Sequence, residues 1–366
     1  MQAPAVDQIE VTVFGPGFGE CIVVHLGASK WLIVDSCIDS ASSQPAALNH
    51  LTKIGVDPAQ VVMVIATHWH DDHIRGMARQ LRACVNARFC TSSALTRSEF
   101  VATIVQYNSR HGIVAGSGAT EMCEVLEILR SRAGATSPVR ASPARHVLTI
   151  PAAESGHGSE AKIITLSPSD KQFDKFLASL STIAPVPLTA KRRMADQDPN
   201  DVSVATLLAI GDQGILLGAD LEENGDEELG WSAVVKLAQR PKADIFKVPH
   251  HGSKNAHCDA VWQEMLGPNP IAIIAPWSRN QGLPTKADVA RLGSKTHSGF
   301  ITSVKGGSIN RARPYAVTKQ IRETVGRIRS SEIATGFVSV RNGGKRNSGM
   351  WCVSRSDNAA HASEWA

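Results

Sequence analysis

One stretch of the chain reads Val61-Val62-Met63-Val64-Ile65-Ala66-Thr67-His68-Trp69-His70-Asp71-Asp72-His73. Its first half is an apolar run of the kind that forms a buried strand. Its second half places three imidazoles and two carboxylates directly after that run. Imidazole nitrogen and carboxylate oxygen are the ligands that zinc and similar divalent ions prefer. The stretch therefore predicts a strand that ends at a metal site.

Four further apolar runs also end at a polar or special residue. The residues that follow them are Asp35, Asp220, the pair His250-His251, and the pair Pro276-Trp277. Helical patterns follow several of these runs, and strands that alternate with helices indicate an α/β protein. In open α/β sheets, sites form beyond the carboxyl ends of the strands. We therefore expect these polar residues to gather at one edge of a sheet.

The remaining patterns predict elements away from this edge. Two strands joined by a glycine-rich loop are expected within residues 9–26, and the Ala-, Ser-, Gly- and Pro-rich segment 131–160 is typical of a surface loop. Helices are expected at residues 74–84, 232–240, 257–266 and 285–295. After residue 297, strands are expected at 300–304, 337–340 and 350–353, with a helix at 315–328.

Charge is distributed unevenly along the 366 residues, whose formal net charge is +4. Twelve Lys or Arg lie between residues 291 and 350, and only Glu323 and Glu332 oppose them. Such a segment indicates an anionic partner, including nucleic acid, although a solvated basic face gives the same pattern. We predict a catalytic domain at 1–296 and a basic α+β extension at 297–366. The extension either completes the sheet or forms an appendage packed on the main domain, and we favour the appendage.

Other features bear on where the protein acts. No apolar stretch approaches the roughly 20 residues that span a bilayer. The first residues lack the charged and apolar regions of a signal peptide. The seven cysteines are scattered without a CxxC pair, which is typical of free thiols in a reducing compartment. We expect a cytoplasmic protein with no membrane partner, and the oligomeric state stays open.

The pattern His68-x-His70-x-Asp72-His73 matches the HxHxDH signature of the metallo-β-lactamase fold. The chain resembles in particular one branch of that family, the metallo-β-lactamase domain of the competence protein ComEC and its soluble relatives. The resemblance implies a four-layer αββα sandwich, but this chain lacks ComEC's membrane channel. Five segments carry it: Phe14 to Val24, Leu32-Ile33-Val34-Asp35-Ser36, Asn200-Asp201-Val202-Ser203-Val204, Leu216-Leu217-Gly218-Ala219-Asp220, and Phe246 to Lys254 with its Pro249-His250-His251-Gly252-Ser253 core.

The resemblance also implies a set of metal ligands for two divalent ions, with zinc expected and manganese as the alternative. One ion would be held by His68 and His70. The other would be held by Asp72 and His73 together with His250 or His251, and Asp220 would bridge both ions. Many family members place a third histidine where this chain has Asn200-Asp201, so the first ion is expected to have fewer protein ligands.

Further roles follow from the same resemblance. Asp35 and Thr67 would orient the ligand histidines. Whichever of His250 and His251 does not ligate would contact the substrate or protonate the leaving oxygen. Substrate-binding positions are expected at Asn200, Asp201, Ser253 and Lys254.

Three functions remain open at this point. The first is a hydrolase that uses a metal-bound hydroxide on phosphodiesters, either a nuclease or a phosphodiesterase. The second is a small-molecule hydrolase of thioesters or lactones, which a deep apolar pocket without a basic rim would favour. The third is a metal-stabilised component of a multi-protein system, such as one encoded in a defence or mobile-element operon.

Overall fold

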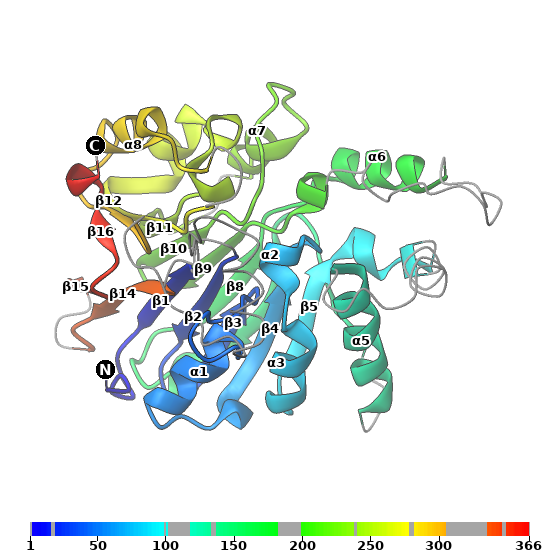
Figure 1. The fold of residues 1–366 in the computed structure, drawn as a ribbon, viewed down its shortest axis with the longest axis horizontal. Helices are drawn as coiled ribbons and strands as arrows, with labels where there is room; N and C mark the ends of the chain where they lie inside the picture. Colours follow the sequence, from blue (N-terminus) through cyan, green and yellow to red (C-terminus); the bar gives the residue numbers. More distant parts are fainter. Residues whose placement is uncertain are drawn as a thin grey trace, which may run out of the picture.

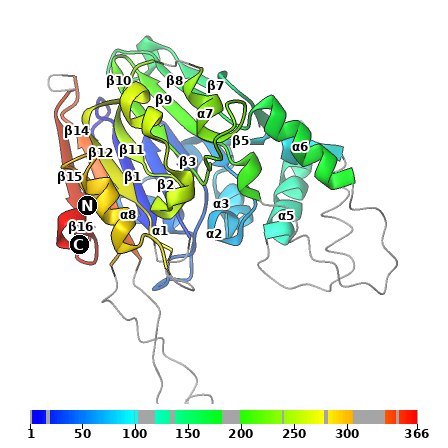
Figure 2. The same cartoon turned by 90° about the horizontal axis from the view of Figure 1, so that it is seen from above.

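The computed structural model describes residues 2–15, 19–98, 100–101, 118–132, 137–181, 199–237, 240–277, 282–304, 335–345 and 349–365. Within these residues the strands form two sheets of eight, which pack face to face and carry helices on their outer faces (Figures 1 and 2). This arrangement is the four-layer αββα sandwich that the sequence predicted. In the described part of the chain, no helix is long and apolar enough to cross a membrane.

The first sheet begins with antiparallel strands and continues with parallel ones. Strands β15, β14, β1, β2 and β3 pair antiparallel, and β3 to β6 pair parallel. Its spatial order is β15 (Trp351–Arg355), β14 (Gly336–Asn342), β1 (Glu10–Gly15), β2 (Cys21–His25), β3 (Trp31–Val34), β4 (Val61–Ala66), β5 (Arg88–Ser92) and β6 (Val139–Ala141).

The second sheet has its parallel strands in the middle, because β10 to β13 pair parallel and the flanking strands pair antiparallel. Its order is β16 (Ala360–His361), β13 (Gly299–Ile301), β12 (Leu266–Ile274), β11 (Ala243–Lys247), β10 (Gln213–Leu217), β9 (Thr206–Ile210), β8 (Ala161–Thr165) and β7 (Arg145–Ile150). Both sheets place parallel strands next to one another, so several carboxyl ends lie side by side.

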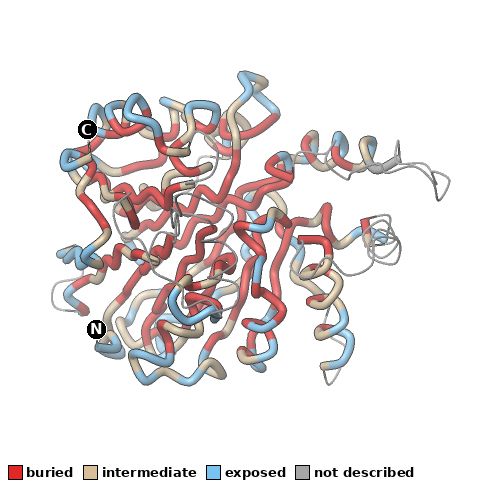
Figure 3. Tube along the Cα trace, viewed as in Figure 1, coloured by how far each residue is buried: buried red, intermediate tan, exposed pale blue. Residues whose placement is uncertain are grey.

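The sequence of strand β4 is apolar without interruption because the strand is covered on both faces. Met63 and Ile65 belong to the core between the two sheets, whereas Val64 and Ala66 belong to the core between the first sheet and its helices. Successive side chains of a strand point to opposite faces, so a strand covered on both faces needs apolar residues at every position. Figure 3 shows these strands buried along their length, whereas the helices expose their outer sides.

Helices cover each sheet and complete the outer layers. Helices α1 and α3 lie against the first sheet, α7 and α8 lie against the second, and α5 and α6 lie toward one side (Figure 1). The described α-helices are α1 (Ala46–Lys53), α2 (Asp71–Ile74), α3 (Met77–Ala83), α5 (Gly118–Ser131), α6 (Asp170–Ser181), α7 (Gly230–Val235) and α8 (Lys286–Gly293).

Two predictions about elements are wrong. Residues 131–160 are not a loop, because β6 and β7 lie there and join different sheets. Strand β6 has only three residues, and β7 is exposed at several positions, so neither shows the apolar run of a buried strand. The helix expected at 257–266 is only one helical turn, Val261–Met265, and β12 begins directly after it. The first part of β12 was not recognised as a strand because Pro268 and Pro270 interrupt its strand pattern.

The described strands after residue 297 are hydrogen-bonded into both sheets. Strand β14 lies between β15 and β1 in the first sheet, and β13 and β16 lie at one edge of the second. The helix expected at 315–328 falls outside the described residues. The division of the chain at residue 296 stays a prediction.

Candidate metal centre

The candidate site lies where strands of both sheets end. Asp35 follows β3, and Thr67 follows β4 and precedes the three histidines of the HxHxDH pattern. In the second sheet, Asp220 follows β10 and the His250-His251 pair follows β11. Residues far apart in the sequence therefore meet because the carboxyl ends of these strands point to one edge of the sandwich.

Four buried side chains form what we call the metal cluster: Asp72, His73, Asp220 and His251. The Nε2 atom of His73 lies 3.3 Å from Oδ2 of Asp220 and 3.6 Å from Oδ2 of Asp72. The Nε2 atom of His251 lies 3.2 Å from Oδ2 of Asp72 and 3.6 Å from Oδ2 of Asp220. Two imidazoles and two carboxylates thus converge on one small volume.

Two atoms of the metal cluster fit a bound cation. Nε2 of His73 and Oδ1 of Asp220 are buried and have no hydrogen-bond partner. Buried polar atoms in folded proteins almost always have a partner, so each such atom requires an explanation. Imidazole nitrogen and carboxylate oxygen are ligands for zinc and manganese. A divalent cation in the metal cluster would satisfy both atoms.

The other two histidines of the HxHxDH pattern lie beside this cluster. Nε2 of His68 is 3.1 Å from Nδ1 of His70, and the ring of His68 lies 4.2 Å, between centroids, from the ring of His73. Asn200 donates through Nδ2 to Oε1 of Glu222, and Asp201 is exposed.

Asp35 fixes the orientation of His73. Its carboxylate accepts hydrogen bonds from the backbone N–H and the hydroxyl of Thr67, each at 2.8 Å, and its Oδ2 lies 2.7 Å from Nδ1 of His73. With Nδ1 held by Asp35, the Nε2 atom of His73 faces the metal cluster. Asp35 itself has a φ of +61°, and Asp tolerates this left-handed conformation better than most residues.

The two adjacent histidines after β11 take different positions. His250 and His251 have φ values of +45° and +54°, and this tight turn sends their side chains in different directions. His251 enters the metal cluster, while its Nδ1 lies 2.9 Å from the carbonyl oxygen of Ala275. His250, the other candidate ligand, instead lies 3.0 Å from Oε1 of Glu222 and 3.1 Å from Oδ1 of Asn255. The structure therefore brings His251, and not His250, to the other ligands.

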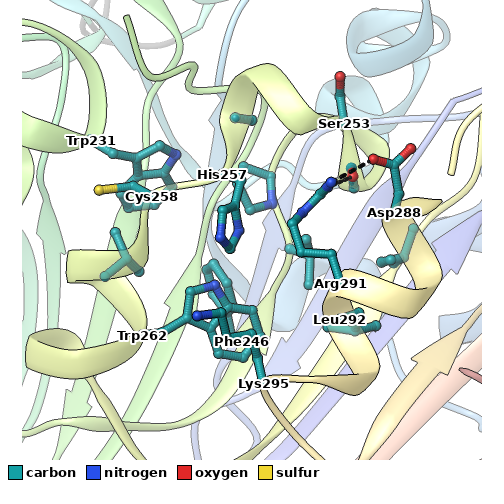
Figure 4. A pocket seen from close by; sticks show the side chains of 16 residues that line it. Trp231, Phe246, Ser253, His257, Cys258, Trp262, Asp288, Arg291, Leu292 and Lys295 are labelled. Carbon is teal, nitrogen blue, oxygen red and sulfur yellow. Dashed lines mark hydrogen bonds and ion pairs between the residues drawn. The ribbon is translucent and has the colours of Figure 1, made fainter. Parts of the chain in front are cut away.

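The two predicted substrate-binding residues after this turn lie outside the metal cluster. Lys254 is exposed. Ser253 lines a narrow cavity of about 20 Å³ between β11, β12 and α8, shown in Figure 4. Figure 4 also shows Arg291 paired with Asp288 at the rim of this cavity, at 2.8 Å. No residue of the metal cluster lines the cavity.

The charges in the metal cluster support one another. Burial raises the pKa of the Asp72 and Asp220 carboxyls, but His73 and His251 outweigh it and hold both pKa values below the usual range. Burial lowers the pKa of the two imidazoles, and the carboxylates, Asp220 foremost, outweigh it and raise both pKa values. The imidazoles and carboxylates thus favour each other's charged forms, so a cation that binds to these imidazoles competes with protons.

Sequence reasoning missed two charged residues directly behind the metal cluster. Glu20 shares one small volume with His73, Asp220 and His251, since one ligand atom from each of the four lies within 4.8 Å of the others. Lys247, at the end of β11, is fully buried and lies 2.5 Å from Oε1 of Glu20. A lysine inside the apolar run Ile245-Phe246-Lys247-Val248 is the signal that could have drawn attention to this pair.

Comparisons with known proteins bear on the fold. The model of the Metallo-beta-lactamase superfamily matches residues 14–98. Similar solved structures include the metallo-β-lactamase fold protein YhfI from Bacillus subtilis, with 16% identity over 66% of this chain and 70% of that chain and a TM-score of 0.33. Another is a HARLDQ-motif mutant of a Cronobacter sakazakii metallo-β-lactamase, with 12% identity over 67% of this chain and 79% of that chain and a TM-score of 0.36. A search of curated proteins finds no match.

The matched segment contains the end of β1, all of β2 to β5 and the whole HxHxDH pattern. With the two packed sheets and their outer helices, it identifies the fold of this chain as the metallo-β-lactamase fold. The chain carries a candidate centre for divalent metal ions at the edge where the strands of both sheets end.

Proposed function

We propose that this protein is a metal-dependent hydrolase that acts on phosphodiesters, as a soluble relative of the ComEC-type branch. The observation that carries the proposal is the metal cluster, where buried imidazoles and carboxylates converge and two of their atoms lack a hydrogen-bond partner. A site of this composition at the carboxyl ends of strands is suited to cations and to the chemistry they support.

The proposed ligands divide into two groups that share the carboxylate of Asp220. The metal cluster would hold one divalent ion, and His68 and His70 would hold a second ion together with Asp220. When bound, such ions lower the pKa of water and stabilise negative charge on the group under attack. The protein's own task is to hold these ligands in place, which the contact of Asp35 with His73 illustrates.

His250 is suited to meet the substrate. Its side chain is 20% exposed, whereas His251 is enclosed, so His250 is the more accessible of the two. Glu222 and Asn255 hold its Nδ1 side, which leaves Nε2 to donate to an oxygen of the substrate or of the leaving group.

The choice of a phosphodiester rests on the motifs shared with the ComEC-type branch and on the basic segment 291–350. Of the twelve cations in that segment, eight lie outside the described residues. Arg291, Lys295 and Arg341 are paired with Asp288, Asp259 and Glu10. The thioester or lactone alternative gains no support from the cavity in Figure 4, because a volume of about 20 Å³ is small and none of the metal cluster lines it.

The proposal is tested on the purified protein by two measurements made together. Metal content per chain is determined by elemental analysis, and hydrolysis is measured on bis-p-nitrophenyl phosphate and on single- and double-stranded DNA. We expect bound metal and cleavage that His68→Ala with Asp72→Ala abolishes. His146→Ala, at an exposed histidine, is the matched control and is expected to change neither measurement.

Other outcomes point elsewhere. Bound metal without cleavage under zinc, manganese or magnesium contradicts the phosphodiester substrate, and thioesters and lactones are then the next substrates. A protein that holds metal and cleaves none of these classes supports the role of a metal-stabilised component in a larger assembly.

A further inference from the structure

We infer that the buried ion pair of Glu20 and Lys247 is a positioning device that sets the metal affinity of the metal cluster. The inference rests on the proposed function only in taking that cluster to be a metal site. Neither residue is part of the HxHxDH pattern or of the ligand set that the resemblance implies.

The first step of the argument is the position of Glu20. Its two carboxylate oxygens lie behind the two histidines of the metal cluster. Oε1 is 3.8 Å from Nδ1 of His73, and Oε2 is 3.7 Å from Nδ1 of His251. The Nε2 atoms of the same rings face Asp72 and Asp220. Glu20 therefore acts on both imidazoles from the side opposite to the ligand atoms, and negative charge there makes a ligating nitrogen a stronger donor to a metal.

The second step is the position of Lys247. Its Nζ atom is fully buried, lies 2.5 Å from Oε1 of Glu20 and donates to the carbonyl oxygen of Ala219 at 3.2 Å. Ala219 precedes Asp220 and has a φ of +46°, a left-handed conformation that a residue with a Cβ adopts at a cost. Lys247 thus helps to hold the turn that aims Asp220 at the metal cluster.

The third step is the backbone around Glu20. Its N–H donates to the carbonyl oxygen of Asp72 at 2.9 Å. Gly19 packs so closely on that same carbonyl that a Cβ at Gly19 would lie 2.7 Å from its oxygen. Through these contacts the pair reaches every member of the metal cluster, and it joins the β1–β2 loop of the first sheet to β11 of the second.

A buried ion pair is an unfavourable way to join two sheets if that is its only role. Two charges must leave water, and a pair of similar apolar side chains is often as stable or more stable. Oε2 of Glu20 also has no hydrogen-bond partner, which is unfavourable for a purely structural carboxylate. Both features are explained if the charge of Glu20 acts on His73 and His251.

The test measures metal binding and not catalysis. The full chain is stripped with a chelator, and Co²⁺ is titrated against a competing chelator while the visible spectrum of the bound ion is recorded. We expect Glu20→Gln to lower the Co²⁺ affinity of the tightest site by about 10- to 100-fold, the usual size of an effect from a residue that contacts the ligands. We also expect it to change the visible spectrum of the bound Co²⁺. Urea unfolding of the metal-free protein is measured in parallel.

Two further variants separate positioning from a structural role. Glu20→Gln combined with Lys247→Met removes both charges, so the metal-free protein is expected to be nearly as stable as the unmodified chain, while Co²⁺ affinity stays low. Glu10→Gln is the matched control, because Glu10 is another buried carboxylate in an ion pair, with Arg341 at 2.6 Å, at the far end of β1. It is expected to change stability and to leave Co²⁺ binding unchanged.

The inference is overturned if the double variant binds Co²⁺ with the affinity and spectrum of the unmodified chain. It is equally overturned if Glu10→Gln weakens Co²⁺ binding as much as Glu20→Gln does. Failure of the proposed substrate leaves this result untouched, since no substrate is used. An unmodified chain that binds no Co²⁺ contradicts both the inference and the metal-dependent function.

Discussion

At the scale of single residues, the two adjacent histidines after β11 differ in what they contact. His251 meets Asp72 and Asp220, whereas His250 meets Glu222 and Asn255. His250 and His251 have the same side chain, so any difference between their roles comes from their different positions. The sequence left open which of the two would ligate, because both follow the same strand.

This difference leads to a prediction for metal content. We expect His251→Ala to lower the bound metal per chain severely, because it removes one of the four groups of the metal cluster and leaves the two carboxylates short of a partner. His250→Ala is expected to retain its metal and to lose turnover by about 10²- to 10⁴-fold, the usual contribution of a proton-transferring group. Elemental analysis and phosphodiester hydrolysis check both variants, and metal loss in His250→Ala alone contradicts this assignment.

The candidate site was predictable from the sequence only in part. His68, His70, Asp72 and His73 stand within six positions after an apolar run, so local pattern was enough to find them. Glu20 and Lys247 belong to other segments, and their roles depend on how the two sheets pack. A glycine-rich loop and a lysine at a strand end have many explanations until the long-range contact between them is known.

At the scale of elements, the strands that lead to the site were the easiest to predict. Strands β3, β4, β10 and β11 are covered on both faces, so their sequences are apolar at nearly every position. Strand β6 was missed because it has only three residues, and β7 was missed because it exposes part of its length. A strand buried on both faces can therefore be recognised from its sequence, whereas a half-exposed strand at the edge of a sheet is difficult to recognise.

The β1–β2 loop gives a prediction at the same scale. Gly19 has a φ of +97°, and a Cβ there would lie 2.7 Å from the carbonyl oxygen of Asp72 and 2.8 Å from the Cβ of Cys37. Gly19→Ala is expected to lower the free energy of unfolding by about 2–4 kcal/mol, since strain and a backbone collision add together. Urea unfolding measures this change.

Gly55 provides the matched control for this substitution. Its φ is +73°, but a Cβ there would meet nothing within 4 Å. Gly55→Ala is therefore expected to cost only the conformational strain, about 1–2 kcal/mol. Equal losses in the two variants would show that the close contact between Gly19 and Asp72 contributes nothing.

At the scale of the whole molecule, two histidines outside the metal cluster make the stability of the fold depend on pH. Burial lowers the pKa of His25 and of His50 from 6.5 to about 4. The unfolded chain therefore binds more protons than the folded chain between these two pH values. The contribution of these two histidines to the free energy of unfolding is fully present above pH 6.5. It falls as the pH drops toward 4, by about 1.4 kcal/mol per pKa unit for each group.

The measurement that checks this is the urea unfolding of the metal-free protein between pH 7.5 and 4. His50→Gln, which cannot take up a proton, is expected to show a flatter fall in stability across that range than the unmodified chain. His146→Ala is the control, because His146 is exposed and its loss should leave the slope unchanged. Identical slopes in all three proteins would contradict a role for His50.

The place of β14 between β15 and β1 has a consequence for how the chain is made. The hydroxyl of Thr12 donates to that of Ser339, so partners 327 residues apart complete the first sheet. At about 5–20 residues per second, a ribosome needs roughly 15–65 s to supply the second partner after the first. Throughout that time β1 presents an unpaired edge, the kind of surface that captures other strands. Synthesis of this protein therefore includes an interval in which its first strand must be shielded until the last part of the sheet emerges.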